Sequence, residues 1–162
     1  MRRPRVRTIV LTLLLTLMAA AKKPAPLPDF GLTSLDSKTV RSDKLKLPNQ
    51  WLLVYVQPHS SYSESVLNEL KDQQQNTANQ KVIIVVGAAK LADAQSMQDQ
   101  FPHIKSATWY ADTNREALQK MQITGVPCVL GMRNDTVQWQ FIGTHAKPGH
   151  LKSMLKTWRD KK

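Results

Sequence analysis

One cysteine and a short serine-rich segment are the residues in this sequence with the most direct bearing on chemistry. The 162-residue chain has a single cysteine, Cys128, within the apolar segment Val-Pro-Cys-Val-Leu. One thiol excludes an internal disulfide, a Cys-x-x-Cys redox pair and a cysteine-rich zinc site. Two interpretations of Cys128 stay open: a small buried hydrophobe, or a lone redox thiol able to anchor a mixed disulfide.

The serine-rich segment His59-Ser60-Ser61-Tyr62-Ser63 places hydroxyl groups next to an imidazole. A serine nucleophile needs a base beside its hydroxyl and an acid that orients the base. No Gly-x-Ser-x-Gly segment or candidate acid accompanies these serines. Serines at a helix start are good N-caps, and Ser61 with Glu64 has the spacing of a capping box. We therefore expect Ser60 and Ser61 to cap a helix and His59 to face solvent, and we assign no catalytic residue.

The histidines show no metal-binding pattern. They are dispersed along the chain, at His59, His103, His145 and His150. The last two are five residues apart with an Ala-Lys-Pro-Gly segment between them, which is not a spacing typical of paired metal ligands. We predict no metal site and no cofactor.

The N-terminus has the composition of a secretory signal. Four arginines in the first seven residues precede an uncharged, mainly apolar run that starts at Thr8 and ends in three alanines. Basic, apolar and small-residue segments in this order form a cleavable signal. The run reaches Ala21 after 14 residues, fewer than the roughly 20 that span a bilayer. We predict a signal peptide over residues 1–21 and export to the periplasm or the medium; an uncleaved N-terminal membrane anchor is the alternative.

The chain is basic, with 23 lysines and arginines against 12 acidic residues and a net charge of +11. Removal of residues 1–21 takes away four arginines, so 19 cationic side chains face 12 acidic ones and the net charge becomes +7. Cations near the C-terminus can attract an anionic membrane surface or an acidic partner. Export and the lack of a motif combining basic and aromatic residues disfavour nucleic acid as a partner.

The apolar pattern predicts where the folded domain lies. Residues 22–28 (KKPAPLP) have the composition of an extended linker, so we expect the domain to cover residues 29–162. Residues 30–32 and 39–41 flank a turn-like Asp-Ser-Lys segment and predict a β-hairpin. Apolar runs at residues 51–56 and 82–86 predict strands buried on both faces, and residues 61–75 between them supply the helical crossover of a βαβ unit.

The second half of the chain continues this alternation. Residues 92–101 predict a helix, residues 108–111 a strand and residues 114–121 a short helix. Residues 128–132 and 137–142 predict a hairpin around Arg-Asn-Asp. The last predicted helix, residues 148–158, has one apolar face, formed by Leu151, Met154, Leu155 and Trp158. The order of elements predicts an α/β fold with a mixed β-sheet and helices on both faces.

These elements together resemble the thioredoxin-like superfamily. The resemblance rests on the strand at residues 51–56, the loop Gln57-Pro58-His59, the helix after it, and Gly125-Val126-Pro127 before the hairpin and the last helix. The subgroup with the most similar opening segment, Pro-Asp-Phe-Gly-Leu, is the exported redoxins of the TlpA-like type. The resemblance covers residues 28–158 and implies a three-layer sandwich, a cis bond before Pro127 and a glycine, Gly143, before the last helix.

The resemblance also implies that the redox motif is degenerate. Ser60, Ser61, Tyr62 and Ser63 occupy the positions of the family's Cys-x-x-Cys, so both cysteines are replaced by serine. Thiolate is the attacking species in disulfide exchange. A helix dipole contributes about 1 kcal/mol, far too little to ionise a serine hydroxyl. Dithiol exchange is therefore not available to this chain.

We interpret the sequence as an exported, non-catalytic binding or accessory module for a protein or peptide. In catalytic relatives an extended polypeptide enters the groove that His59, Tyr62, Val126 and Pro127 would line here. One alternative is an enzyme, a single-cysteine redox protein that uses Cys128. The other is a structural or assembly protein tethered to the membrane by an uncleaved N-terminus.

Overall fold

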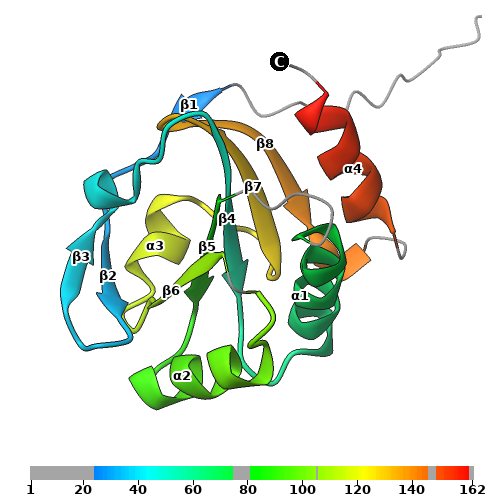
Figure 1. The fold of residues 1–162 in the computed structure, drawn as a ribbon. Coiled ribbons are helices and arrows are strands. Elements are labelled where there is room, and N and C mark those ends of the chain that lie inside the picture. Colours follow the sequence, from blue (N-terminus) through cyan, green and yellow to red (C-terminus); the bar gives the residue numbers. More distant parts are fainter. Residues whose placement is uncertain (1–23, 75–80, 105, 146–148, 161–162) are drawn as a thin grey trace, which may run out of the picture.

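One mixed β-sheet organises the molecule. The computed structural model describes residues 24–74, 81–104, 106–145 and 149–160. The strands of the sheet are β1 (Ala25–Pro26), β2 (Gly31–Ser34), β3 (Thr39–Arg41), β4 (Gln50–Val56), β5 (Lys81–Val86), β6 (Ala107–Ala111), β7 (Cys128–Arg133) and β8 (Thr136–Ile142). Their spatial order is β1-β8-β7-β4-β5-β6-β2-β3, which places the two long apolar runs side by side at the centre (Figure 1).

The central strands confirm the predicted βαβ unit. β4 and β5 pair in parallel, and the helix α1 (Ser61–Gln74) connects them. Every residue of β4 after Gln50, and every residue of β5 after Lys81, is buried. Successive side chains of a strand point to opposite faces, so these runs fill two cores at once. Leu52, Val54 and Val56 belong to one core, while Leu53 and Tyr55 belong to the other.

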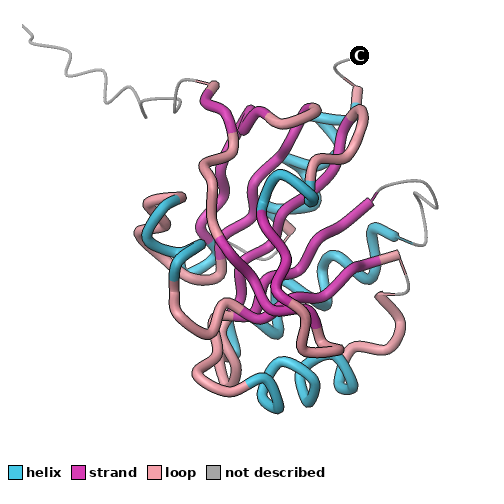
Figure 2. The backbone as a smooth tube through the Cα atoms, turned by 90° about the vertical axis from the view of Figure 1, so that its left-hand side faces the viewer, coloured by secondary structure: helices cyan, strands magenta, loops and turns pink. Residues whose placement is uncertain are grey.

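The remaining helices cover both faces of the sheet, as expected. α2 (Leu91–Gln100) and α4 (His150–Arg159) join α1 on one face, where Leu67, Met97 and Leu155 share a core. The short helix α3 (Glu116–Lys120) covers the other face through Ala117, together with the turn η1 (Ser42–Leu45). Figure 2 shows the twisted strand layer with helices on both sides. The predicted apolar face of α4 is confirmed, because Leu151, Leu155 and Trp158 are buried.

The N-terminal boundary differs from the prediction. Ala25 and Pro26 form β1, which pairs with Val137 and Thr136 of β8. Leu27 is buried in the α3-side core, and its backbone N–H donates to the carbonyl of Asp135 at 2.7 Å. The sheet therefore begins within the segment assigned to a linker, because a partner strand, not an apolar pattern, decides this pairing.

Two other expectations concern residues that the structure leaves out. The predicted signal peptide, residues 1–21, and the first two residues of the expected linker lie outside the described residues. In the parts of the chain that are described, no helix is long and apolar enough to cross a membrane.

Candidate functional site

The serine-rich segment lies where the central strand β4 leads into α1. β4 ends at Val56 and α1 begins at Ser61, so four residues make the turn between them. His59 has a φ of 57°, in the left-handed region that few residues other than glycine adopt. Its side chain is exposed, as the sequence predicted.

Two serines fasten this turn by hydrogen bonds. The Ser60 Oγ accepts the backbone N–H of Ser63 at 3.3 Å, which is the N-cap bond of α1. The Ser63 Oγ accepts the backbone N–H of Gln57 at 3.1 Å, and the Ser63 side chain is fully buried. The cap therefore lies at Ser60, one residue before the predicted capping box of Ser61 and Glu64.

These contacts leave the serines no catalytic partner. Among the described residues, neither hydroxyl is hydrogen-bonded to an imidazole or a carboxylate. A serine nucleophile needs such a base to take its proton. Within the described ranges, Ser60 and Ser63 thus serve to hold the turn together.

Gly143 connects this helix start to the loop before β7. The peptide bond between Val126 and Pro127 is cis, as the resemblance implied. A Cβ on Gly143 would come within 2.7 Å of Pro127 Cγ, closer than real Cβ atoms approach, and would make a tight contact of 3.0 Å with Val66 Cγ2. The Gly143 N–H also donates to the Pro127 carbonyl at 2.9 Å. Because Val66 belongs to α1, the absent side chain lets the cis-proline loop pack beside that helix.

Exposure differs among the four residues expected to line a groove. Tyr62 is 55% exposed and is the only large apolar side chain left exposed in the described part of the chain. His59 is exposed, Val126 is half-buried and Pro127 is buried. Tyr62, His59 and Val126 are thus accessible to solvent, while Pro127 is not.

Cys128 lies on the far side of the sheet from α1. It is fully buried and belongs to the α3-side core together with Tyr55 and Leu130. The Gln140 side chain donates from Nε2 to its Sγ at 3.3 Å. A partner disulfide cannot reach this sulfur unless the core opens, which supports the interpretation of Cys128 as a small buried hydrophobe.

A buried tyrosine and carboxyl pair was not found from the sequence. The Tyr55 hydroxyl donates to Asp112 Oδ2 at 3.0 Å, and Asp112 also accepts the backbone N–H groups of Ala117 and Leu118. Burial, and then the negative charge of Asp112, raise the pKa of Tyr55 far above its ordinary value. The pair fixes the start of α3 against the sheet. The only sequence feature that points to this pair is the turn-like segment Asp-Thr-Asn after β6, which begins with Asp112.

The titratable residues do not gather into a metal site. Within the described ranges, no group of three or more histidine, cysteine, aspartate or glutamate side chains could hold a metal ion.

Comparison with known proteins identifies the fold. No protein-family model matches the chain, and no curated protein matches it significantly. Solved structures do. A protein assigned as thiol:disulfide interchange protein DsbE from Chlorobium tepidum has a TM-score of 0.67 at 18% identity, over 87% of this chain and 98% of that one.

Two further solved structures have a similar fold. A secreted disulfide oxidoreductase from Mycobacterium tuberculosis, homologous to Escherichia coli DsbE, has a TM-score of 0.65 at 13% identity, over 79% of this chain and 95% of its own. The thioredoxin domain of a thiol-disulfide oxidoreductase from Bacteroides vulgatus has a TM-score of 0.63 at 10% identity, over 83% and 95%. The chain therefore has the thioredoxin-like fold.

Proposed function

We propose that this chain is an exported thioredoxin-like protein that binds an extended polypeptide without exchanging disulfides. The fold is that of proteins named as thiol-disulfide oxidoreductases. In this chain, the helix start after the central strand carries Ser60 and Ser63 and no cysteine.

The observation that carries the proposal is the exposure of Tyr62. This side chain is 55% exposed one position before the fully buried Ser63, on the first turn of α1. Tyrosine combines a large apolar ring with a polar tip, and it is enriched in protein interfaces for that reason. The exposed ring of Tyr62, beside the capped start of α1, is therefore available to contact a partner chain.

The chemistry of the site supports binding over catalysis. Disulfide exchange needs a thiolate that attacks and a second sulfur that resolves the mixed disulfide. Serine oxygen can do neither, and both hydroxyls already accept backbone hydrogen bonds. A redox role for Cys128 would require a thiol reagent to enter the α3-side core, where the sulfur is fully buried.

Export is part of the proposal and rests on two observations. The first 21 residues have the composition of a secretory signal. One structural neighbour is described as secreted. Mass spectrometry of the mature N-terminus tests this directly: a chain that starts at Lys22 supports cleavage, and an intact Met1 on exported protein supports the tethered alternative.

A defined polypeptide tests the binding function. The probe is reduced, carboxymethylated lactalbumin, an unfolded chain with no free thiol, titrated against the protein by fluorescence anisotropy. Tyr62→Ala should weaken binding by about tenfold, the effect of removing an interface hot spot. Asn68→Ala, on an exposed position of the same helix, is the matched control. Absence of binding, or equal affinity of both variants, would overturn the proposal.

A further inference from the structure

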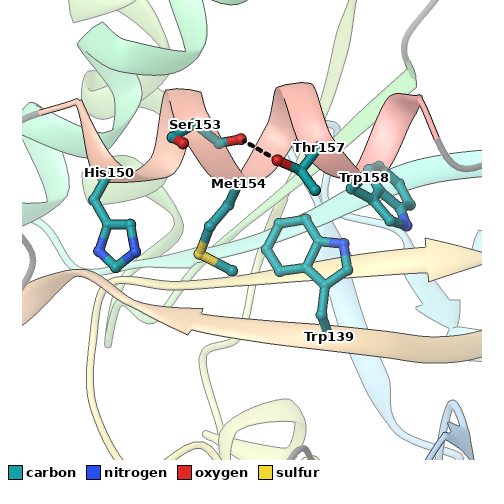
Figure 3. Close-up of a pocket in the computed structure, with 6 residues that line it drawn as sticks. All are labelled: Trp139, His150, Ser153, Met154, Thr157 and Trp158. Carbon is teal, nitrogen blue, oxygen red and sulfur yellow. Dashed lines mark hydrogen bonds between the residues drawn. The ribbon is translucent and has the colours of Figure 1, made fainter.

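The last helix, α4, uses two sides of its surface for contacts within the fold. Its apolar face is buried in the core that it shares with α1 and α2. One flank lines a pocket of about 290 Å³ beside Trp139 of β8. Figure 3 shows His150 and Met154 pointing from this flank toward the strand. A third side of the helix takes part in neither contact.

A basic stripe runs along this third side. It consists of Lys152, Lys156 and Arg159, which follow one another at i, i+4 and i+7, the spacing of residues on one helix face. The buried apolar residues have the same spacing one position earlier, and one residue turns a helix by about 100°. The basic stripe therefore lies beside the buried face, on the side away from the pocket. Lys152 and Lys156 are exposed, and residues 150–159 include no acid.

The positive charge of the stripe increases toward the end of α4. At the start of the helix, the Glu69 carboxylate of α1 accepts the backbone N–H of Gly149 at 3.3 Å. At the other end, Arg159 Nε donates to the carbonyl of Leu155 at 3.1 Å, which holds the guanidinium beside the last turn. Two of the three cations, Lys156 and Arg159, belong to that turn.

This end of α4 lies at the same end of the sheet as β1. The Gln50 side chain, at the start of β4, donates from Nε2 to the carbonyl of Trp158 at 3.4 Å. Next to it, the Asn49 carbonyl accepts the N–H of Asn134, in the turn between β7 and β8, and β1 pairs with β8 directly after this turn. Figure 1 shows β1 and the last turn of α4 at one end of the molecule. Tyr62 follows the opposite end of β4.

The sequence adds cations next to both ends of the described chain. Two lysines, residues 22–23, precede Pro24, and two more, residues 161–162, follow Asp160. With the basic stripe, these make seven cations, and Asp160 is the one acid among them. Clusters of about four to eight lysines and arginines beside a membrane segment or on an amphipathic helix are typical of binding to anionic lipid.

We propose that the basic stripe of α4 binds the anionic headgroups of a lipid bilayer. A bilayer is favoured over an acidic protein because residues 1–21 have the composition of a membrane-directed signal, and the described chain begins where α4 ends. Cleavage after residue 21 and retention of the signal both leave the lysines at residues 22–23 beside the stripe. This contact is separate from Tyr62, so either proposal can fail without the other.

Vesicle sedimentation tests the proposal on the protein with its natural N-terminus. Vesicles of equal parts phosphatidylglycerol and phosphatidylcholine supply an anionic surface, and vesicles of phosphatidylcholine alone supply a neutral one. The protein should partition more strongly onto the anionic vesicles. This preference should fall as salt is added, since salt screens the attraction between exposed charges.

A double variant tests the stripe itself. Lys152→Gln with Lys156→Gln should lower partitioning onto the anionic vesicles by about tenfold, because each removed lysine weakens the attraction to the surface. The matched control, Lys90→Gln with Lys120→Gln, makes the same change in net charge at two exposed lysines that follow β5 and β6. The control should partition like the unmodified protein.

A single variant separates lipid binding from helix stability. Lys156 also complements the helix dipole at the end of α4, whereas Lys152, near the start of the helix, does not. Lys152→Gln alone should therefore keep the circular dichroism spectrum and thermal midpoint of the unmodified protein while still losing part of the partitioning onto anionic vesicles.

Three results would overturn the proposal. One is equal partitioning of the unmodified protein onto anionic and neutral vesicles. Another is an equal loss in the stripe variant and the control, which would assign the attraction to net charge alone. The third is binding of poly-glutamate that depends on Lys152 and Lys156 while the vesicles are not bound, which would assign the stripe to an acidic protein.

Discussion

Cys128 lies directly opposite Tyr55 on adjacent antiparallel strands, and both side chains are buried in the core that α3 covers. α1, with the serine-rich turn at its start, packs on the other face of the sheet. The one thiol of the chain and the turn expected to carry the family's thiols are therefore separated by the sheet itself. This arrangement assigns Cys128 to the core and leaves the surface at Tyr62 without sulfur.

The first prediction follows from the burial of Cys128. A thiol reagent such as dithionitrobenzoate should leave the native protein unmodified and react with one thiol per chain in denaturant, because the sulfur is inaccessible until the core opens. A Ser60→Cys variant, with its new thiol on the partly exposed cap, serves as the control and should react natively. If Cys128 of the folded, unmodified protein reacts rapidly with the reagent, the result would support the alternative of a single-cysteine redox protein.

The second prediction concerns cysteines placed at the positions of the expected redox motif. A variant with Ser60→Cys and Ser63→Cys should form an internal disulfide and gain insulin-reducing activity, because the helix N-terminus lowers the pKa of a cysteine placed there. A Ser60→Cys and Ser61→Cys pair, with the wrong spacing, should stay inactive. If the two thiols of the first variant do not pair on mild oxidation, the placement of the degenerate motif at residues 60–63 is wrong.

The third prediction concerns the close approach at Gly143. Gly143→Ala places a Cβ 2.7 Å from Pro127 Cγ, a distance that real Cβ atoms do not show, and in tight contact with Val66. The neighbours must move, and we expect a loss of about 1–3 kcal/mol in the free energy of unfolding. Ser65→Ala, on the exposed face of α1, is the control. Urea denaturation measures both, and an unchanged midpoint for Gly143→Ala would show that the cis-proline loop does not pack on the helix as described.

The fourth prediction is a pH dependence set by Tyr55. Burial and Asp112 raise its pKa in the folded state above the ordinary value near 10. Its contribution to stability is thus fully present below pH 10 and declines as pH rises above it, since the unfolded chain releases the proton first. Tyr110, whose pKa burial also raises, acts in the same direction.

The pH effect is measured by urea unfolding between pH 8 and about 11 in a Tyr110→Phe background. Tyr55→Phe should lower stability by about 1–2 kcal/mol at pH 8, because Asp112 loses a donor. The same variant should flatten the decline above pH 10. A decline of equal slope in both proteins would mean that Tyr55 ionises freely and is not held by Asp112.

Local pattern was enough to predict most of the scaffold. β4 and β5 are uninterrupted apolar runs because both faces of each strand are buried. The last helix was predictable because Leu151, Leu155 and Trp158 repeat at helical spacing. In these elements, burial requires apolar residues in a continuous run or at a regular spacing. Both patterns can be recognised from residues that are close together in the sequence.

Features decided by distant partners were not predictable in this way. β1 contains only Ala25 and Pro26, and it is a strand only because β8 offers an edge. Tyr55 and Asp112 are 57 positions apart, and no spacing rule connects them. The sequence predicted a cap at Ser60 and Ser61 without choosing between them, because the two residues have the same chemistry and only the backbone decides that Ser60 accepts the bond.

Binding without disulfide exchange is tested by a pull-down from the exported fraction with and without a reducing agent. The same partner proteins should be recovered under both conditions, and Tyr62→Ala should lose them while Asn68→Ala retains them. Partners that disappear on reduction, or that are retained by Tyr62→Ala, would contradict this prediction.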